Sequence, residues 1–157
     1  MSGNRKRRIP GAASAASPKK SVPTAAKQAL TATLRLPMAG RLTVRWTRFD
    51  YDGPFCLGAS AIGTIVQMFK AVSHLETMTP AEVFNGGVGK DYGDPAGLPN
   101  PEAVRRLQDL QLQDETNISR LSFMGRQRLY GIRRDLDFYP IFWDPEHRIW
   151  PSVKKHT

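Results

Sequence analysis

The amino-acid sequence predicts an α+β fold in which one strand and two or three helices precede a C-terminal antiparallel meander. Short apolar runs after residue 120 are separated by Gly125, by Asp135-Leu-Asp137 and by Asp144-Pro145, which is typical of strands joined by tight turns. Between residues 60 and 110, apolar residues instead recur at helical spacing. A small sheet cannot bury its apolar face alone, so these helices are expected to pack on it.

The first strand and the first helix follow from hydrophobic periodicity. Leu42, Val44 and Trp46 alternate with polar residues and predict a strand, which ends at the turn Asp50-Tyr-Asp-Gly-Pro54. A helix of about four turns is predicted from about Ser60. Its expected apolar face consists of Ile62, Ile65, Val66, Phe69, Val72 and Leu75.

Capping signals predict two further helices. Thr79-Pro-Ala-Glu82 is a capping box with proline at the first helical position, and Gly86-Gly87 ends that short helix. The glycine-rich stretch 86–99 is expected to be a mobile loop. It is not a phosphate-binding loop, because such a loop needs a strand before it and a helix directly after it. Asn100 then caps a third helix that begins with Pro101-Glu102.

The C-terminal meander is predicted from residues that alternate between apolar and polar. The turn Asp144-Pro-Glu-His147 leads into Arg148-Ile-Trp150. If this segment is a strand, the meander has four strands; otherwise it has three. The apolar positions of the first three strands are Leu121 and Phe123, then Tyr130 and Ile132, then Tyr139, Ile141 and Trp143.

The net charge of +9 in the 157-residue chain comes almost entirely from its beginning. Residues 1–40 contain eight Lys or Arg and no Asp or Glu, and they are rich in Ala, Ser and Pro, so we expect a disordered basic arm. Residues 41–157 contain fifteen basic and fourteen acidic residues, and we expect them to form a single domain. Within that domain, residues 49–118 are mainly acidic and residues 119–157 are mainly basic.

Cysteine content and hydropathy indicate a cytoplasmic protein. Cys56 is the only cysteine, so the chain can form no internal disulfide, and a reducing compartment is the natural setting. No apolar run approaches the ~20 residues of a membrane span. We therefore expect a cytoplasmic location with no membrane contact.

The order of elements resembles the RelE-like fold of small bacterial toxins, which cut messenger RNA on the ribosome or inhibit other essential machinery. Several motifs also resemble a set of small bacterial proteins that includes SocB-type replication-inhibitor toxins. The motifs are Phe49-Asp-Tyr-Asp-Gly-Pro-Phe55, Thr77-Met-Thr-Pro-Ala-Glu-Val-Phe84, Ser122 through Tyr130-Gly-Ile132, Phe142-Trp-Asp-Pro-Glu-His147, Pro151 and Lys154-Lys-His-Thr157.

The SocB-type resemblance implies a toxin that stops DNA replication by binding the β sliding clamp. It also implies a SocA-like antitoxin that acts as an adaptor and delivers the toxin to the ClpXP protease, and an association with the nucleoid or replisome. Such a toxin would be an inhibitor without catalytic residues, cofactors or metal. A RelE-like, ribosome-dependent messenger-RNA endonuclease is the alternative.

Two segments could supply a clamp-binding peptide, in which apolar side chains fill adjoining pockets while the backbone bonds to the rim. Thr33-Leu-Arg-Leu-Pro-Met38 matches such a hexapeptide except at its first position, where Gln is usual. The same cluster could instead dock on the domain as its first residues. Gln67-Met-Phe-Lys-Ala-Val72 has the leading Gln, but it lies in the first predicted helix. The candidate clamp contacts are Leu34, Arg35, Leu36, Pro37, Met38, Gln67 and Phe69.

The nuclease alternative would use basic residues to hold a phosphate and a His, Tyr, Lys or Glu for proton transfer. Its candidates are Arg126, Arg128, Arg133, Arg134, Glu146, His147, Arg148 and His156. The competing interpretation is that these arginines form a solvated sheet face and that Asp144-Pro-Glu-His147 is a structural turn with His147 hydrogen-bonded locally. Tyr130, Tyr139 and Trp150 could stack on bases, although packing is the commoner use of aromatics.

The arm offers a further, sequence-independent contact. Arg5, Lys6, Arg7 and Arg8 could attract nucleic-acid phosphates weakly and in a salt-sensitive way, or they could merely make the tail soluble. The acidic helical half is a candidate face for the antitoxin. Three function classes therefore stay open: clamp inhibitor, RNA endonuclease and a binding module of another target.

Overall fold

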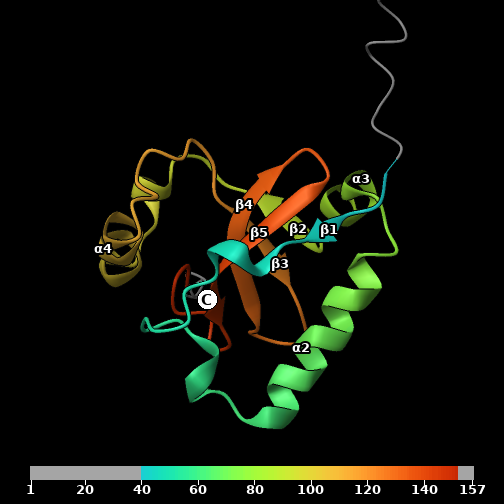
Figure 1. Ribbon diagram of the computed structural model, residues 1–157, viewed down its shortest axis with the longest axis horizontal. Coiled ribbons are helices and arrows are strands. Elements are labelled where there is room, and N and C mark those ends of the chain that lie inside the picture. Colours follow the sequence, from blue (N-terminus) through green and yellow to red (C-terminus); the bar gives the residue numbers. More distant parts are fainter. Residues whose placement is uncertain (1–39, 152–157) are drawn as a thin grey trace, which may run out of the picture. The chain divides into compact units, whose positions relative to one another are not determined.

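The structure, a computed structural model, describes residues 40–151. These residues contain a five-stranded mixed sheet (Figure 1). The strand order is β1-β5-β4-β3-β2, and the predicted α+β class is confirmed. The predicted basic arm, apart from Gly40, lies outside the described residues. The elements are β1 (Thr43–Val44), η1 (Trp46–Arg48), η2 (Leu57–Ala59), α2 (Ile62–Leu75), α3 (Pro80–Asn85), β2 (Gly89–Asp91), η3 (Pro95–Gly97), α4 (Pro101–Asp109), β3 (Ser119–Ser122), β4 (Arg128–Arg134) and β5 (Asp137–Asp144).

The antiparallel meander is confirmed as β3, β4 and β5. A bulge between Tyr130 and Gly131 interrupts the β4–β5 register, and a Cβ at Gly131 would overlap the backbone carbonyl of Tyr139. Glycine is therefore needed where the two strands approach most closely. The beginning of the described chain also belongs to the sheet, because β1 pairs with β5 in parallel.

Two expectations about strands were wrong, and of the two alternatives for the meander the structure has the one with three strands. Gly89–Asp91 is not part of a loop but the edge strand β2, because it pairs with β3. The first strand is short, since the chain turns into η1 at Trp46. Arg148–Trp150 forms no strand, because the Asp144 carboxylate accepts the backbone N–H groups of Arg148 and Ile149 and holds a turn there.

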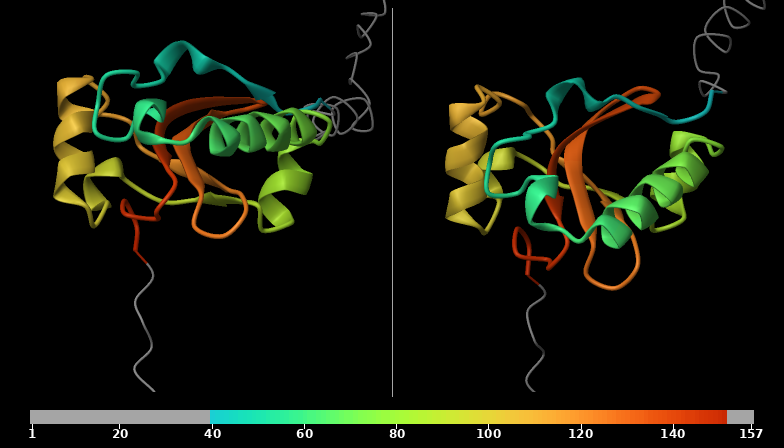
Figure 2. Two further views of the ribbon diagram at one scale, coloured as in Figure 1. Left: turned by 90° about the horizontal axis from the view of Figure 1, so that it is seen from below. Right: turned by 60° about the horizontal axis from the view of Figure 1, so that its bottom comes forward.

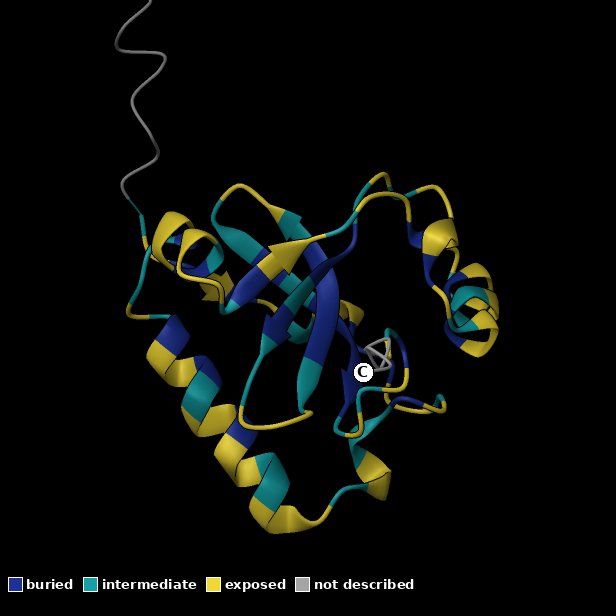
Figure 3. Ribbon diagram, turned by 180° about the vertical axis from the view of Figure 1, so that it is seen from behind, coloured by how far each residue is buried: buried dark blue, intermediate teal, exposed yellow. Residues whose placement is uncertain are grey.

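The predicted first helix exists, but its packing face differs from the expected one. Helix α2 buries Met68, Val72 and Leu75, whereas Ile62, Val66 and Phe69 are exposed. Only one side of α2, from Met68 onward, is buried in the core, and the outward face is coloured as exposed in Figure 3. Helical periodicity alone therefore overestimated the buried surface of α2.

Both predicted capping arrangements are confirmed. The Thr79 side chain accepts a hydrogen bond from the Glu82 N–H, and the Glu82 carboxylate accepts one from the Thr79 N–H. Asn100 Oδ1 caps α4 by accepting from Glu102 N and Ala103 N. Local side-chain chemistry thus sets where α3 and α4 begin.

Two apolar cores lie on the two faces of the sheet. One contains Leu121, Leu129 and Trp143 and packs against α2 and α3. The other contains Tyr130 and Phe142 and packs against α4. Figure 2 shows α4 at one end of the sheet and α3 at the other. Among residues 40–151, no helix has the length and apolar character needed to cross a membrane.

Candidate anion-binding site

Five polar side chains gather on the sheet face opposite α2, and they are called here the β3–β4 cluster. Arg120 and Ser122 of β3 lie directly opposite Tyr130 and Arg128 of β4, respectively. All four share one face because side chains alternate along a strand, and Leu121 and Leu129 point the other way into the core with α2. His147, from the turn after β5, completes the cluster, because both arginines act electrostatically on its ring.

The cluster holds polar atoms that are buried without a hydrogen-bond partner. Among residues 40–151 there are six such side-chain atoms, and five of them belong to the cluster. The five atoms are Arg120 Nε, Ser122 Oγ, Arg128 Nε, Tyr130 OH and His147 Nε2. Burying a polar group unpaired costs about 1–3 kcal/mol, so this concentration marks a place built for a ligand or for ordered water.

The charge of this face is net positive. Lys90 of β2 lies opposite Arg120 in the register, so that Lys90, Arg120 and Arg128 share the face. None of these three cations forms an ion pair with another residue in 40–151. Asp144 lies opposite Arg128, but its two oxygens accept backbone N–H groups. An anion would therefore meet two or three cations and one carboxylate that is already engaged.

The titratable groups of the cluster respond to burial and to that charge. Burial, and next the neighbouring Arg120, lower the pKa of Arg128. Burial, with the Arg128 and Arg120 guanidinium groups, lowers the pKa of His147, which keeps a neutral imidazole at neutral pH. Burial raises the pKa of Tyr130, which keeps its hydroxyl protonated. The site thus pairs a neutral base with a protonated hydroxyl beside fixed cations.

The turn that carries His147 is held rigidly. His147 has a φ of 60°, in the left-handed region that is costly for a non-glycine residue. Asp144 supports this backbone by accepting from Arg148 N at 2.8 Å and from Ile149 N at 2.7 Å. The turn predicted at Asp144-Pro-Glu-His147 is present. The expected local hydrogen bond of His147 is absent at Nε2, which has no partner within the described part of the chain.

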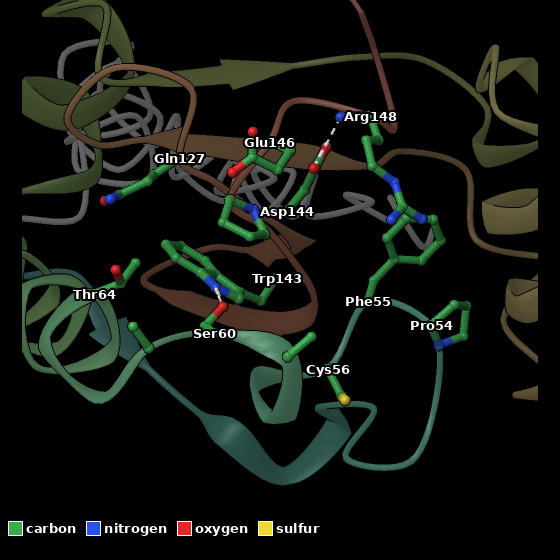
Figure 4. A pocket seen from close by; sticks show the side chains of 13 residues that line it. Pro54, Phe55, Cys56, Ser60, Thr64, Gln127, Trp143, Asp144, Glu146 and Arg148 are labelled. Atoms are coloured by element: carbon green, nitrogen blue, oxygen red, sulfur yellow. Dashed lines mark hydrogen bonds between the residues drawn. The ribbon is translucent and has the colours of Figure 1, made fainter.

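The same turn borders a pocket of about 400 Å³ (Figure 4). Trp143 lies in its wall, with its indole N–H donating to Ser60 Oγ at 2.9 Å. Glu146 and Arg148 line the pocket, and the Arg148 guanidinium lies 5.3 Å from the centre of the Phe55 ring. Because these polar groups are largely exposed and already partnered, the pocket gives a weaker indication of a ligand than the cluster does.

Most of the predicted nuclease candidates lie outside the cluster. Arg128 and His147 belong to it. Arg133, Arg134 and Arg148 instead pair with Asp91, Glu115 and Glu102, respectively. Arg126 lies 3.9 Å from Glu146 in an exposed pair, and His156 lies outside the described residues.

Sequence reasoning missed Arg120, Ser122 and Lys90. Arg120 and Ser122 alternate with Leu121 in a predicted strand. The alternation that puts Leu121 in the core therefore also puts Arg120 and Ser122 on one common face. Nothing in the sequence indicates that this face is covered, because the residues that border it come from β2 and from the C-terminal turn.

The predicted clamp contacts are only partly within the described chain. Leu34, Arg35, Leu36, Pro37 and Met38 lie outside the described residues, as do Arg5, Lys6, Arg7 and Arg8. Gln67 and Phe69 lie on α2 with exposed side chains, while Met68 between them is fully buried. Phe69 was expected in the core but is 41% exposed and packs against Trp46 at 5.1 Å between ring centroids.

Comparison with models of protein families, with curated proteins and with solved structures found no match to this chain. The resemblance to RelE-like and SocB-type toxins therefore stays a prediction. Among residues 40–151, no group of three or more His, Cys, Asp or Glu side chains is placed to hold a metal ion.

Proposed function

We propose that the β3–β4 cluster binds a phosphate group of RNA and that the chain is an RNA endonuclease of the toxin type. The observation that supports this proposal is the set of five unpartnered buried polar atoms, two of which belong to guanidinium groups that have no carboxylate partner among residues 40–151. Phosphodiester oxygens accept hydrogen bonds and carry negative charge, so they would satisfy donors of this kind.

Four of the five residues of the cluster have a role in this proposal. Arg120 and Arg128 hold the scissile phosphate and stabilise the charge that develops on its oxygens. His147 Nε2 accepts the proton of the ribose 2′-hydroxyl, whose oxygen forms a bond to phosphorus. The bond from phosphorus to the 5′ oxygen breaks, and Tyr130 gives its hydroxyl proton to that oxygen. The proton held by the His147 imidazolium then returns to the Tyr130 oxygen, so that both groups end as they began. The products are a 2′,3′-cyclic phosphate and a 5′-hydroxyl end.

The experiment incubates the purified chain with end-labelled RNA, both free and on translating ribosomes, and identifies the new ends. Arg120→Gln and His147→Gln should each reduce cleavage by about 100-fold. The matched control is Arg105→Gln, because Arg105 is an exposed residue of α4 outside the cluster and should leave cleavage unchanged. Absence of cleavage on both substrates, or full activity in the cluster variants, would overturn the proposal.

Inhibition of the β sliding clamp is the second candidate function. It is favoured by the clamp-like peptide Thr33-Leu-Arg-Leu-Pro-Met38, which ends two residues before Gly40, where the described body begins. The rival segment around Gln67 is helical and buries Met68 and Val72, so it would have to unfold to bind as an extended peptide. In this proposal a SocA-like adaptor and ClpXP limit the toxin, and the basic arm Arg5–Arg8 adds weak contact with DNA.

Clamp binding is tested with the full chain. Leu36→Ala combined with Met38→Ala should weaken binding to purified sliding clamp by about 2–4 kcal/mol if these side chains fill the anchoring pocket. The control pair Gln67→Ala and Phe69→Ala should bind normally. Pulse labelling after expression separates the two functions, since a clamp inhibitor stops DNA synthesis first and an RNA endonuclease stops protein synthesis first.

A further inference from the structure

Two aromatic side chains form a stack beside the cluster. The rings of Tyr92, which follows β2, and Trp150, near the end of the described chain, have centroids 4.3 Å apart and planes at 24°. Both side chains are half-buried, so part of the stack faces solvent. Their inner edges contact the core that contains Tyr130 and Phe142.

Cations connect this stack to the cluster. Arg120 Cζ lies 5.7 Å from the centre of the Tyr92 ring, and Lys90 Nζ lies 5.0 Å from it. Arg120 therefore contacts the aromatic stack while belonging to the cluster. Trp150 covers one face of Tyr92 and the cations lie over the same ring, so a base that joins the stack would have to add on the Trp150 side.

We propose that the Tyr92–Trp150 stack binds a nucleobase adjacent to the phosphate that Arg120 and Arg128 hold, so that the ligand is single-stranded RNA. This inference rests on the proposed function and specifies its substrate. The part of the half-buried indole that faces solvent offers a flat surface on which any base can stack, and the base must be free of a duplex to reach it. Cations next to the ring favour the phosphates on either side of the stacked base.

The stack could instead serve only to pack the C-terminal turn against the sheet, and the two roles predict different results. If Trp150 only packs, replacing it should lower stability and should change the affinity equally for ligands with and without a base. A binding role makes Trp150 matter for ligands with a base and not for ligands without one.

The test measures binding of adenosine 5′-monophosphate and of ribose 5-phosphate to the full chain by calorimetry. The two probes share the phosphate and the sugar and differ in the base, and neither contains a phosphodiester that could be cleaved. The unmodified chain should bind the monophosphate about tenfold more tightly than the sugar phosphate. Trp150→Leu should abolish this tenfold difference while leaving the affinity for ribose 5-phosphate unchanged.

Three further variants make the result decisive. Trp150→Phe keeps an aromatic face and should retain most of the preference, even if it lowers stability as Trp150→Leu does. Tyr51→Leu removes a 63% exposed aromatic far along the chain from the stack and should change neither affinity. Arg120→Gln should weaken the binding of both probes.

Two outcomes count against the proposal in distinguishable ways. Equal affinity of the unmodified chain for both probes would overturn the nucleobase inference alone, because phosphate binding would persist. Failure to bind either probe would overturn the nucleobase inference together with the phosphate site of the proposed function.

Discussion

Asp50 and Arg106 form a bidentate ion pair that joins the loop after η1 to helix α4. Arg106 Nε donates to Asp50 Oδ2 at 2.8 Å, and its NH2 donates to Oδ1 at 2.7 Å. Asp50 is only 3% exposed, and its N–H donates to the Ile141 carbonyl of β5. Through Asp50, helix α4 is attached to strand β5 of the sheet.

Replacing this carboxylate should destabilise the chain, most clearly at neutral pH. Asp50→Asn should lower the free energy of unfolding by about 1.5–3 kcal/mol, because it removes a charge-assisted bidentate interaction from a buried position. The hydrogen bonds from Arg106 hold the pKa of Asp50 below its ordinary value, whereas burial opposes this shift. The unfolded chain therefore binds a proton at higher pH than the folded chain does, and stability is lost as pH falls below about 4.

Urea unfolding followed by circular dichroism between pH 2.5 and 7 checks both parts of this prediction. The variant should be less stable at pH 7 and should lose less stability than the unmodified chain on acidification. Parallel pH curves for the two proteins would show that Asp50 contributes nothing to the acid sensitivity.

Gly53 is sterically required next to the same pair. A Cβ at Gly53 would overlap Asp50 Oδ2 and would lie 2.7 Å from Arg106 Nε. Gly53→Ala should therefore displace the pair and cost about 1–3 kcal/mol of unfolding free energy. The matched control is Gly63→Ala in α2, where a Cβ meets nothing within 4 Å and where alanine should stabilise the helix by about 0.5–1 kcal/mol. Thermal melts that shift in the same direction for both variants would contradict the steric argument.

Asp144 should be essential for the turn that presents His147. Asp144→Ala leaves the N–H groups of Arg148 and of the fully buried Ile149 without their acceptor, and we expect a loss of about 2–4 kcal/mol of unfolding free energy. Asp144→Asn keeps one acceptor oxygen and should lose about half as much. Amide hydrogen exchange at Arg148 and Ile149 should rise in the same order. Unchanged exchange at both amides would mean that the turn is held by other contacts.

The elements that sequence analysis predicted well depend on neighbours in the chain. The capping box at Thr79 and the Asn100 cap use side chains within three residues of the amides that they bind, and the meander follows from alternation within each strand. The fold class follows from these local signals because they agree with one another.

The misjudged elements depend on partners that are distant in sequence. Strand β2 exists because Gly89–Asp91 lies opposite β3, and its composition of glycine and charged residues is that of a loop. Helical spacing in α2 does not reveal that Ile62, Val66 and Phe69 lie outside the contact with the sheet. The Asp50–Arg106 pair spans 56 residues and leaves no local signal.

The candidate site was only half predictable for the same reason. Arg128 and His147 were identified as candidates because basic and proton-transferring side chains are concentrated after residue 119. Selecting them from eight candidates required the strand register, which puts Arg128 opposite Ser122, and the left-handed turn at His147. Neither feature has a signature within a few residues.

The titration of His147 should report the positive field of the cluster. Burial lowers the pKa of His147 first, and the Arg128 and Arg120 guanidinium groups lower it further, while Asp144 opposes them. In the full chain, the His147 imidazole resonances should therefore titrate below about pH 6.5. Arg128→Gln removes one repelling charge and should move this titration to higher pH, whereas Arg105→Gln on α4 should leave it in place.

The same shift should appear in RNA cleavage, because His147 must be neutral to accept the 2′-hydroxyl proton. Cleavage should fall as pH drops through the His147 pKa, and in Arg128→Gln the remaining activity should fall at a higher pH. Inorganic phosphate bound at the cluster should also raise the His147 pKa, since an anion favours the imidazolium. NMR titration from pH 4 to 8, with His147→Gln to assign the signal, measures these values. A His147 signal that titrates identically with phosphate, without phosphate and in Arg128→Gln would place the imidazole outside the field of the arginines and remove it from the proposed reaction.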